Sequence, residues 1–162
     1  MTNGISLTNR RMTAAKGQPA YLPNQPIIHN CIVDPTLAAN TYLSPGDVVA
    51  LQSAATLKGV TVVKKAAVTD TPCGVVVFNS IKSGFAANDK ISIFPVNSFV
   101  YLPAGAANIK LGDNLQFNAS GQVVTTATAS NGYIGIAWTA PSAENDLVVV
   151  QIVPGMEAAA SS

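Results

Sequence analysis

The sequence predicts an all-β protein, and three observations support this prediction. Short apolar segments recur from Tyr42 onward, and several of them alternate apolar and polar residues with the two-residue period of a strand. Turn-forming Gly, Asn, Asp and Pro residues separate these segments. Only "PTLAANTYL", residues 35–43, is compatible with a brief helical turn. We therefore expect a compact β-sandwich or a small β-barrel.

About nine or ten short strands are expected. "KISIF" at Lys90–Phe94 places Ile91 and Ile93 on one face, and "LVVVQIV" at Leu147–Val153 is apolar on both faces. Asn131-Gly132 predicts a hairpin between the segments on either side of it. The expected strands cover residues 27–33, 48–51, 59–63, 75–78, 90–94, 98–103, 115–118, 122–128, 133–138 and 147–153.

The N-terminal part of the chain differs from the rest in composition and sequence pattern. Prolines recur at short intervals through "KGQPAYLPNQPIIHNCIVDP", and proline disfavours helix in itself and in the residue before it. We expect an extended, Pro-rich arm over residues 1–40, a β domain over residues 41–154 and a flexible tail over residues 155–162. The arm has apolar anchors, so it is expected to lie on its own domain or on a neighbouring subunit. These anchors include Tyr21, Leu22, Ile27 and Ile28.

Four aspartates follow Gly or Asn and precede an apolar run. They are Asp47, Asp89, Asp113 and Asp146. Aspartate is favoured in turns because its carboxylate binds backbone N–H groups one or two residues further along the chain, and the neighbouring glycine supplies the unusual φ angle of a reversal. Nothing in the spacing brings two of these carboxylates together, and no loop clusters acids as a calcium site does. We interpret the aspartates as turn residues between strands.

The composition excludes several classes of partner. Nine Lys and Arg against eight Asp and Glu give no basic field for nucleic acid or for an anionic membrane. No apolar run approaches the roughly 20 residues of a membrane-spanning helix, and "MTNGISLTNRR" lacks the apolar part of a secretion signal. Charged residues are only 10% of the chain, against about 25% in an average domain. Such a charge-poor surface favours association with other proteins.

The sequence offers little chemistry. His29 is the only histidine, so no multi-histidine metal site exists, and an enzyme would depend on His29 with Cys31, whose side chains would have to be re-aimed toward each other. No nucleotide-binding or zinc-protease motif is present, and no cofactor or small-molecule substrate is expected. Cys31 and Cys73 are expected to be reduced thiols, although a bridge between them stays open. Trp138 shares a face of "YIGIAW" with Ile134 and Ile136, which predicts that it is buried.

A small basic cluster lies in the arm. Arg10, Arg11 and Lys16 are the only clustered cations. Three cations are too few for a nucleic-acid site with a large salt dependence. We expect them to pair with acidic groups on a protein neighbour.

The segment from Tyr42 to Val153 resembles the decoration, or capsid cement, proteins of tailed bacteriophages. The resemblance lies in "SPGDVVAL", "CGVVV", "NDKISIFPVNSFVYLPA" and above all the closing order of "KLGDNLQF", "ASGQVV", "IGIAW", "END" and "LVVVQI". It implies a small β domain that binds the outside of a capsid at local three-fold or two-fold positions. The long Pro-rich arm departs from the shortest members of that family.

We therefore expect a non-enzymatic virion protein on the capsid surface, present in the host cytoplasm during assembly. Its expected partners are the major capsid protein and itself, as a homotrimer or a dimer, with the arm reaching a neighbour through Arg10, Arg11, Lys16, Tyr21, Leu22, Ile27 and Ile28. The alternative from another class is a receptor- or carbohydrate-binding β module of a phage tail fibre or other surface appendage. That alternative requires exposed aromatic residues, and aromatics are only 6% of the chain.

Overall fold

The structure is a computed structural model that describes residues 14–20, 25–52, 59–126 and 132–153. These residues form ten strands and no helix, which confirms the all-β prediction and the expected number of strands. The strands are β1 Ile28–Val33, β2 Val48–Leu51, β3 Val62–Lys65, β4 Gly74–Val76, β5 Lys90–Phe94, β6 Phe99–Pro103, β7 Asn114–Phe117, β8 Val123–Thr125, β9 Tyr133–Ala137 and β10 Leu147–Ile152.

The first five strands form a closed barrel in the order β1-β3-β2-β4-β5. Strand β1 runs parallel to β3 and antiparallel to β5, and the second pairing closes the barrel. The strand expected near residues 27–33 is therefore present, and it belongs to the protein's own barrel although it lies in the segment assigned to the arm. The barrel interior is filled by buried side chains that include Cys31, Val33, Val49, Val63, Val76, Ile91 and Ile93.

The last five strands form an antiparallel sheet in the order β6-β10-β9-β7-β8. The sheet curls until its two ends nearly meet, because Ala104, just after β6, forms a bridge with Val123 of β8. The N–H of Gly105 donates to the carbonyl of Val123 at 2.7 Å. Both the barrel and the sheet thus cover most of the strand edges that would otherwise attract another chain.

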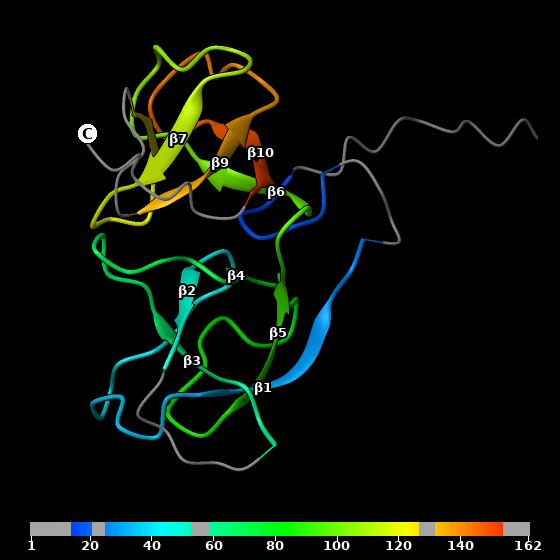
Figure 1. Cartoon of the computed structure of the whole chain (residues 1–162), viewed down its shortest axis with the longest axis vertical. Coiled ribbons are helices and arrows are strands. Elements are labelled where there is room, and N and C mark those ends of the chain that lie inside the picture. Colours follow the sequence, from blue (N-terminus) through cyan, green and yellow to red (C-terminus); the bar gives the residue numbers. More distant parts are fainter. Residues whose placement is uncertain (1–13, 21–24, 53–58, 127–131, 154–162) are drawn as a thin grey trace, which may run out of the picture.

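The sheet packs on the barrel through one shared core. In Figure 1 the two units are stacked along the long axis of the molecule. Val48 of β2, Val75 of β4 and Phe94 of β5 belong to the same buried cluster as the inner side chains of the sheet. The expected β-sandwich or small barrel is therefore realised as a closed barrel capped by a curled sheet.

Residues 15–20 cross from the barrel to the sheet, and we call them the strap. The N–H of Gly17 donates to the carbonyl of Tyr101 at 2.9 Å, and the N–H of Phe78 donates to the carbonyl of Gly17 at 2.8 Å. Pro19 forms a bridge with Val100, so the strap covers the free edge of β6. Only glycine fits at position 17, because a Cβ there would lie 2.5 Å from the backbone nitrogen of Gly46.

The four aspartates close turns, as predicted, but they bind N–H groups that precede them rather than the following ones that were expected. Each carboxylate accepts the backbone N–H of the residue three positions earlier: Asp47 from Ser44 at 2.8 Å, Asp89 from Ala86 at 2.6 Å, Asp113 from Lys110 at 2.7 Å and Asp146 from Ala143 at 2.9 Å. The Gly or Asn before each aspartate has a positive φ angle. Asp70 makes the same bond to Ala67 at 2.8 Å, and the sequence missed it because Thr69 precedes it.

The predicted hairpin at Asn131-Gly132 is wrong. Strand β7 lies between β8 and β9, so the two segments on either side of Gly132 are not neighbours. Gly132 does have the positive φ angle of a turn residue, 82°, while Asn131 lies outside the described residues. The hairpin forms instead between β7 and β8, where Asn118 accepts backbone N–H groups from Ser120 and Gln122.

Residues 35–43, which the sequence left compatible with a brief helical turn, form no helix. Residues 35–43 form two separate turns. The carboxylate of Asp34 accepts the N–H of Thr36 at 2.8 Å, and Asn40 has a φ angle of 62°. Both features compete with helical hydrogen bonding.

Trp138, which the sequence predicts to be buried, is 44% exposed. A register shift between β7 and β9 explains the difference: Leu115 pairs with Gly135 but Gln116 pairs with Tyr133, so Ile134 is an extra residue on β9. Such a bulge breaks the alternation of side chains along a strand. Ile134 and Ala137, three residues apart, both point into the core, and Trp138 therefore faces outward.

Candidate interaction surfaces

His29 and Cys31 do not form a nucleophile–base pair. His29 is exposed, and its Nδ1 lies 2.9 Å from the hydroxyl of Ser92. Cys31 is fully buried in the barrel, because a register shift in β1 between Ile28 and Cys31 turns the two side chains to different sides. The structure therefore does not bring together the two groups that an enzyme would need.

Both cysteines are free thiols in the structure. Burial raises the pKa of the Cys31 thiol. Burial, and to a lesser extent the nearby Cys31, raises the pKa of Cys73 to about 11. Because the thiolate is the reactive form, these groups are inert packing residues at neutral pH.

The described part of the chain has no cluster for a metal ion. Within it, no group of three or more His, Cys, Asp or Glu side chains converges. The same residues include no helix that is long and apolar enough to cross a membrane.

The predicted contact residues of the arm differ in where the structure places them. Arg10, Arg11, Tyr21 and Leu22 lie outside the described residues. Lys16, which we expected to pair with a neighbour, pairs within the chain: its ammonium lies 2.9 Å from a carboxylate oxygen of Asp47. Ile27 and Ile28 are 37% and 43% exposed, so these two side chains are accessible to a partner.

Most charges on the barrel neutralise one another. Asp47 also lies 3.6 Å from the ammonium of Lys65. The other ion pairs of the described residues join Lys64 to Asp70 and Lys82 to Asp89. The pairs of Lys64 with Asp70 and of Lys82 with Asp89 are partly exposed and contribute little stability, but together with the pairs of Asp47 they leave few charges available to attract a charged partner.

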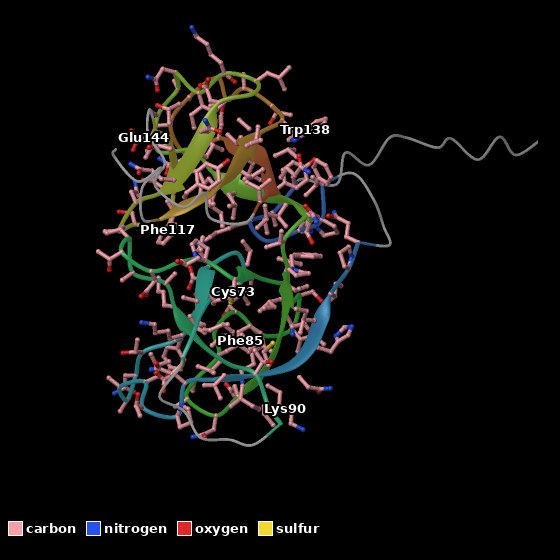
Figure 2. The ribbon with its side chains drawn as sticks, viewed as in Figure 1. Cys73, Phe85, Lys90, Phe117, Trp138 and Glu144 are labelled. Carbon is pink, nitrogen blue, oxygen red and sulfur yellow. The ribbon has the colours of Figure 1, made fainter. Side chains whose placement is uncertain are left out.

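A groove of about 290 Å³ lies on the barrel, and we call it the barrel groove. Its polar groups include the hydrogen-bonded pair of His29 and Ser92, and Phe78, which is 37% exposed, contributes apolar surface. Figure 2 shows Lys90 at the end of the barrel remote from the sheet. The full lining comprises His29, Asn30, Val77, Phe78, Asn79, Phe85, Lys90, Ile91 and Ser92.

Ile81 projects from a fixed loop beside this groove. It is 95% exposed, yet the side-chain oxygen of Asn79 accepts its N–H at 2.8 Å. The next residue, Lys82, pairs with Asp89 at 2.6 Å and lies 5.4 Å from the ring centre of Phe85. Ile81 is not among the contact residues expected from the sequence, although a lone apolar residue inside the polar stretch "NSIKSG" is a signal that could have indicated it.

A second apolar surface lies on the outer side of the sheet, and we call it the sheet face. It consists of Phe99, Tyr101, Ile136, Trp138 and Leu147, which stand on β6, β9 and β10 or directly after them. Their strand neighbours point into the shared core. Figure 2 shows Trp138 at the outer side of the sheet. None of the residues in the five strands of the sheet is charged.

A hollow on the sheet has a polar lining. It measures about 380 Å³ and is lined by Asn108, Lys110, Asp113, Asn114, Thr125 and Thr126. Sugar-binding sites usually combine polar groups with an aromatic ring for stacking, and this lining contains no aromatic residue. The hollow therefore gives no support to the carbohydrate-binding alternative.

Comparison with known proteins identifies the family of this chain. A family model described as phage cement protein matches residues 28–152, which is more than half of the chain. The chain belongs to the phage cement protein family. Its members are structural proteins of the virion head and are not enzymes, so the cement protein is expected to carry no active site. Membership implies that it binds a phage capsid.

One solved structure extends the comparison. The N base of head fibre gp8.5 of bacteriophage phi29 matches the cement protein with a TM-score of 0.55 and 20% identity, over 82% of this chain and 99% of that chain. At this identity the likeness shows a shared fold. A search of the curated proteins found no match.

Proposed function

We propose that this cement protein binds the outer surface of an assembled capsid and bridges neighbouring major capsid subunits. The match to the cement family over residues 28–152 is the observation that supports the proposal most directly. A bridging protein needs at least two separate contact surfaces. The barrel groove with Ile81 and the sheet face lie on different units of the fold and meet this requirement.

The stabilisation would be thermodynamic. A ligand that binds only the assembled shell stabilises it by about 2.7 kcal/mol when its free concentration is 100 times its dissociation constant. Many copies on one shell multiply this effect. The cement protein would act as a homotrimer, with a dimer as the alternative.

The N-terminal residues would extend the reach of each copy. The strap holds Gly17 at the junction of barrel and sheet, and thirteen residues, including Arg10 and Arg11, precede Ala14. Thirteen extended residues span roughly 40 Å, enough to cross onto a neighbouring subunit. Tyr21 and Leu22, which follow the strap, would join that contact.

Co-sedimentation with undecorated heads tests the proposal. The purified protein is mixed with heads that lack it, pelleted through a sucrose cushion and quantified per head. We expect saturable binding and a higher temperature of DNA release from the decorated heads. Failure of the protein to pellet with the heads, or an unchanged release temperature at saturation, would overturn the proposal.

A further inference from the structure

We propose that the sheet face is the surface on which copies of this protein meet one another. The proposal rests on the oligomeric part of the proposed function and adds to it the location of the contact. It follows from the charge, rigidity and edge protection of the sheet.

The residue types of the sheet face are those that dominate protein interfaces. Trp138 is 44% exposed, and Tyr101 and Leu147 are partly exposed beside it. Trp and Tyr contribute a large share of binding energy where they are buried at the centre of an interface. A solvent-facing Trp next to further apolar groups favours a surface that is covered in the working protein.

These side chains are already held in place. The ring of Trp138 meets Phe99 edge to face, with ring centres 5.2 Å apart, and its indole N–H donates to the side-chain oxygen of Gln151 at 2.9 Å. Val149, which lies between Trp138 and Tyr101 on this side of the sheet, is only 2% exposed. A partner would meet a preformed surface and would lose little side-chain entropy on binding.

The absence of charge in the sheet favours a second copy as the occupant. A two-fold contact places a surface against the same surface, and copies of one patch also converge near a three-fold axis, so any charge near either axis would meet its own kind. The five strands of the sheet contain no charged residue, whereas the barrel strands contain Lys64, Lys65 and Lys90. The strands of the sheet can therefore meet the same strands of another copy without like-charge repulsion, and the charges of this unit, such as Lys110 and Asp146, lie in its loops.

The edges of the sheet exclude the other common mode of self-association, in which strands join edge to edge. The strap bonds to β6 through Gly17 and Ala20, and Gly105 bonds to β8 at Val123. With both edges engaged inside the chain, contact through the face is the available mode.

Sedimentation in the absence of heads tests the proposal with three variants of the full chain. At about 50 µM, above the micromolar range of weak self-association, the wild type is expected to sediment as a multiple of the 16.6 kDa chain. Trp138→Glu and Tyr101→Glu should each reduce the apparent mass at least about two-fold, because the new carboxylates of adjacent copies repel. Ile81→Glu, the same type of change at a more exposed position on the barrel, should keep the wild-type mass.

A second readout does not depend on the variants. Trp138 is the only tryptophan, so dilution of the wild type below its dissociation constant should shift its emission to the red and increase its quenching by acrylamide. A wild type that sediments as a single chain at every concentration, or a Trp138→Glu variant of unchanged mass, would overturn the inference. If the wild type is monomeric but binds heads, the proposed capsid binding stands and the sheet-face contact is wrong. If it forms oligomers through the sheet face but does not bind heads, the sheet-face contact stands and the proposed capsid binding is wrong.

Discussion

Single aspartates hold the turns of this protein, and their surroundings favour the ionised form. The ammonium of Lys82 and the N–H of Ala86 keep the pKa of Asp89 below its usual value. The hydroxyl of Ser142 and the N–H groups of Ser142 and Ala143 do the same for the pKa of Asp146. The pKa of Asp70 is lowered first by the N–H of Ala67. Protonating these carboxylates therefore weakens the turns directly.

We predict that stability falls as the solution becomes acidic. A carboxyl group whose pKa is lower in the folded chain than the unfolded value of 3.8 contributes stability that is present above that value. This contribution is lost as the pH falls through the folded pKa. The urea midpoint should therefore drop steeply below about pH 4.

Asp89→Asn is the matched variant for this prediction. It should be less stable than the wild type at neutral pH and should lose less stability on acidification. An equal loss in both proteins would show that Asp89 does not contribute to the acid sensitivity.

At the scale of one residue, the sequence predicted the role of the aspartates but not the position of Trp138. A turn of this kind is local, because the carboxylate bonds to the residue only three positions earlier, so Gly or Asn before Asp is enough to identify it. The exposure of Trp138 depends on the bulge at Ile134, which arises from pairing with β7. The ion pair between Lys16 and Asp47 likewise joins residues that are 31 positions apart in sequence, and no local pattern indicates such a contact.

At the scale of strands, close backbone packing sets the order of the sheet. Strands β9 and β10 approach so closely at Gly135 that a Cβ there would lie 1.9 Å from the carbonyl oxygen of Gln151. The sequence shows Gly135 only as a small residue within an apolar strand. Its role is to let two strands meet beside the bulge.

Gly135→Ala should destabilise the protein by about 3 kcal/mol, because the strands must move apart to accept the methyl group. The measurement is the free energy of unfolding in urea. Gly112→Ala is a useful control, since a Cβ there meets nothing within 4 Å and only its φ angle of 87° opposes the change. A Gly135→Ala protein as stable as this control would show that the close approach is not required.

Two deletions distinguish the contribution of the strap to stability from that of the residues before it. Deletion of residues 1–13 removes none of the contacts described here and should leave the domain folded. Deletion of residues 1–18 also removes Lys16 and Gly17. The buried carboxylate of Asp47 then loses the ammonium of Lys16, and the backbone groups of Tyr101 and Phe78 lose their hydrogen bonds to Gly17. This deletion should cost about 2 kcal/mol or more. Thermal unfolding of both proteins is the check, and equal melting temperatures would contradict the structural role of the strap.

The strands themselves were predictable because period-two patterns and turn residues are local signals. Their pairing was not. The hairpin expected at Asn131-Gly132 fails because β7, from earlier in the chain, lies between the two segments. The closure of the barrel by β1 also depends on contacts between segments far apart in sequence, such as Cys31 with Ile91.

At the scale of the whole molecule, charge is separated from apolar surface. The ion pairs of the described residues lie on the barrel and at the strap, whereas the strands of the sheet have no charged residue. Composition predicted a charge-poor surface suited to association. It could not predict where on the fold that surface lies, because this depends on how the strands are arranged.

This distribution predicts how decoration responds to salt. Apolar contacts are not screened, so heads should stay decorated between about 0.1 M and 1 M salt, where the screening length falls from ~10 to ~3 Å. The measurement is the number of copies per pelleted head at each salt concentration. Binding through a basic arm would instead weaken steeply, and release of most copies over this range would assign the contact to Arg10 and Arg11.

The strap also determines how the molecule responds to mechanical load. A pull on the residues before Ala14 enters the domain at the strap, beside β6 and at the barrel–sheet junction. A force directed along the strap would act on all of its hydrogen bonds to β6 at the same time. The ion pair between Lys16 and Asp47 would oppose separation at the N-terminal end of the strap. Because the strap bonds to Tyr101 of the sheet and to Phe78 beside the barrel, a load applied there would be shared by both units of the fold.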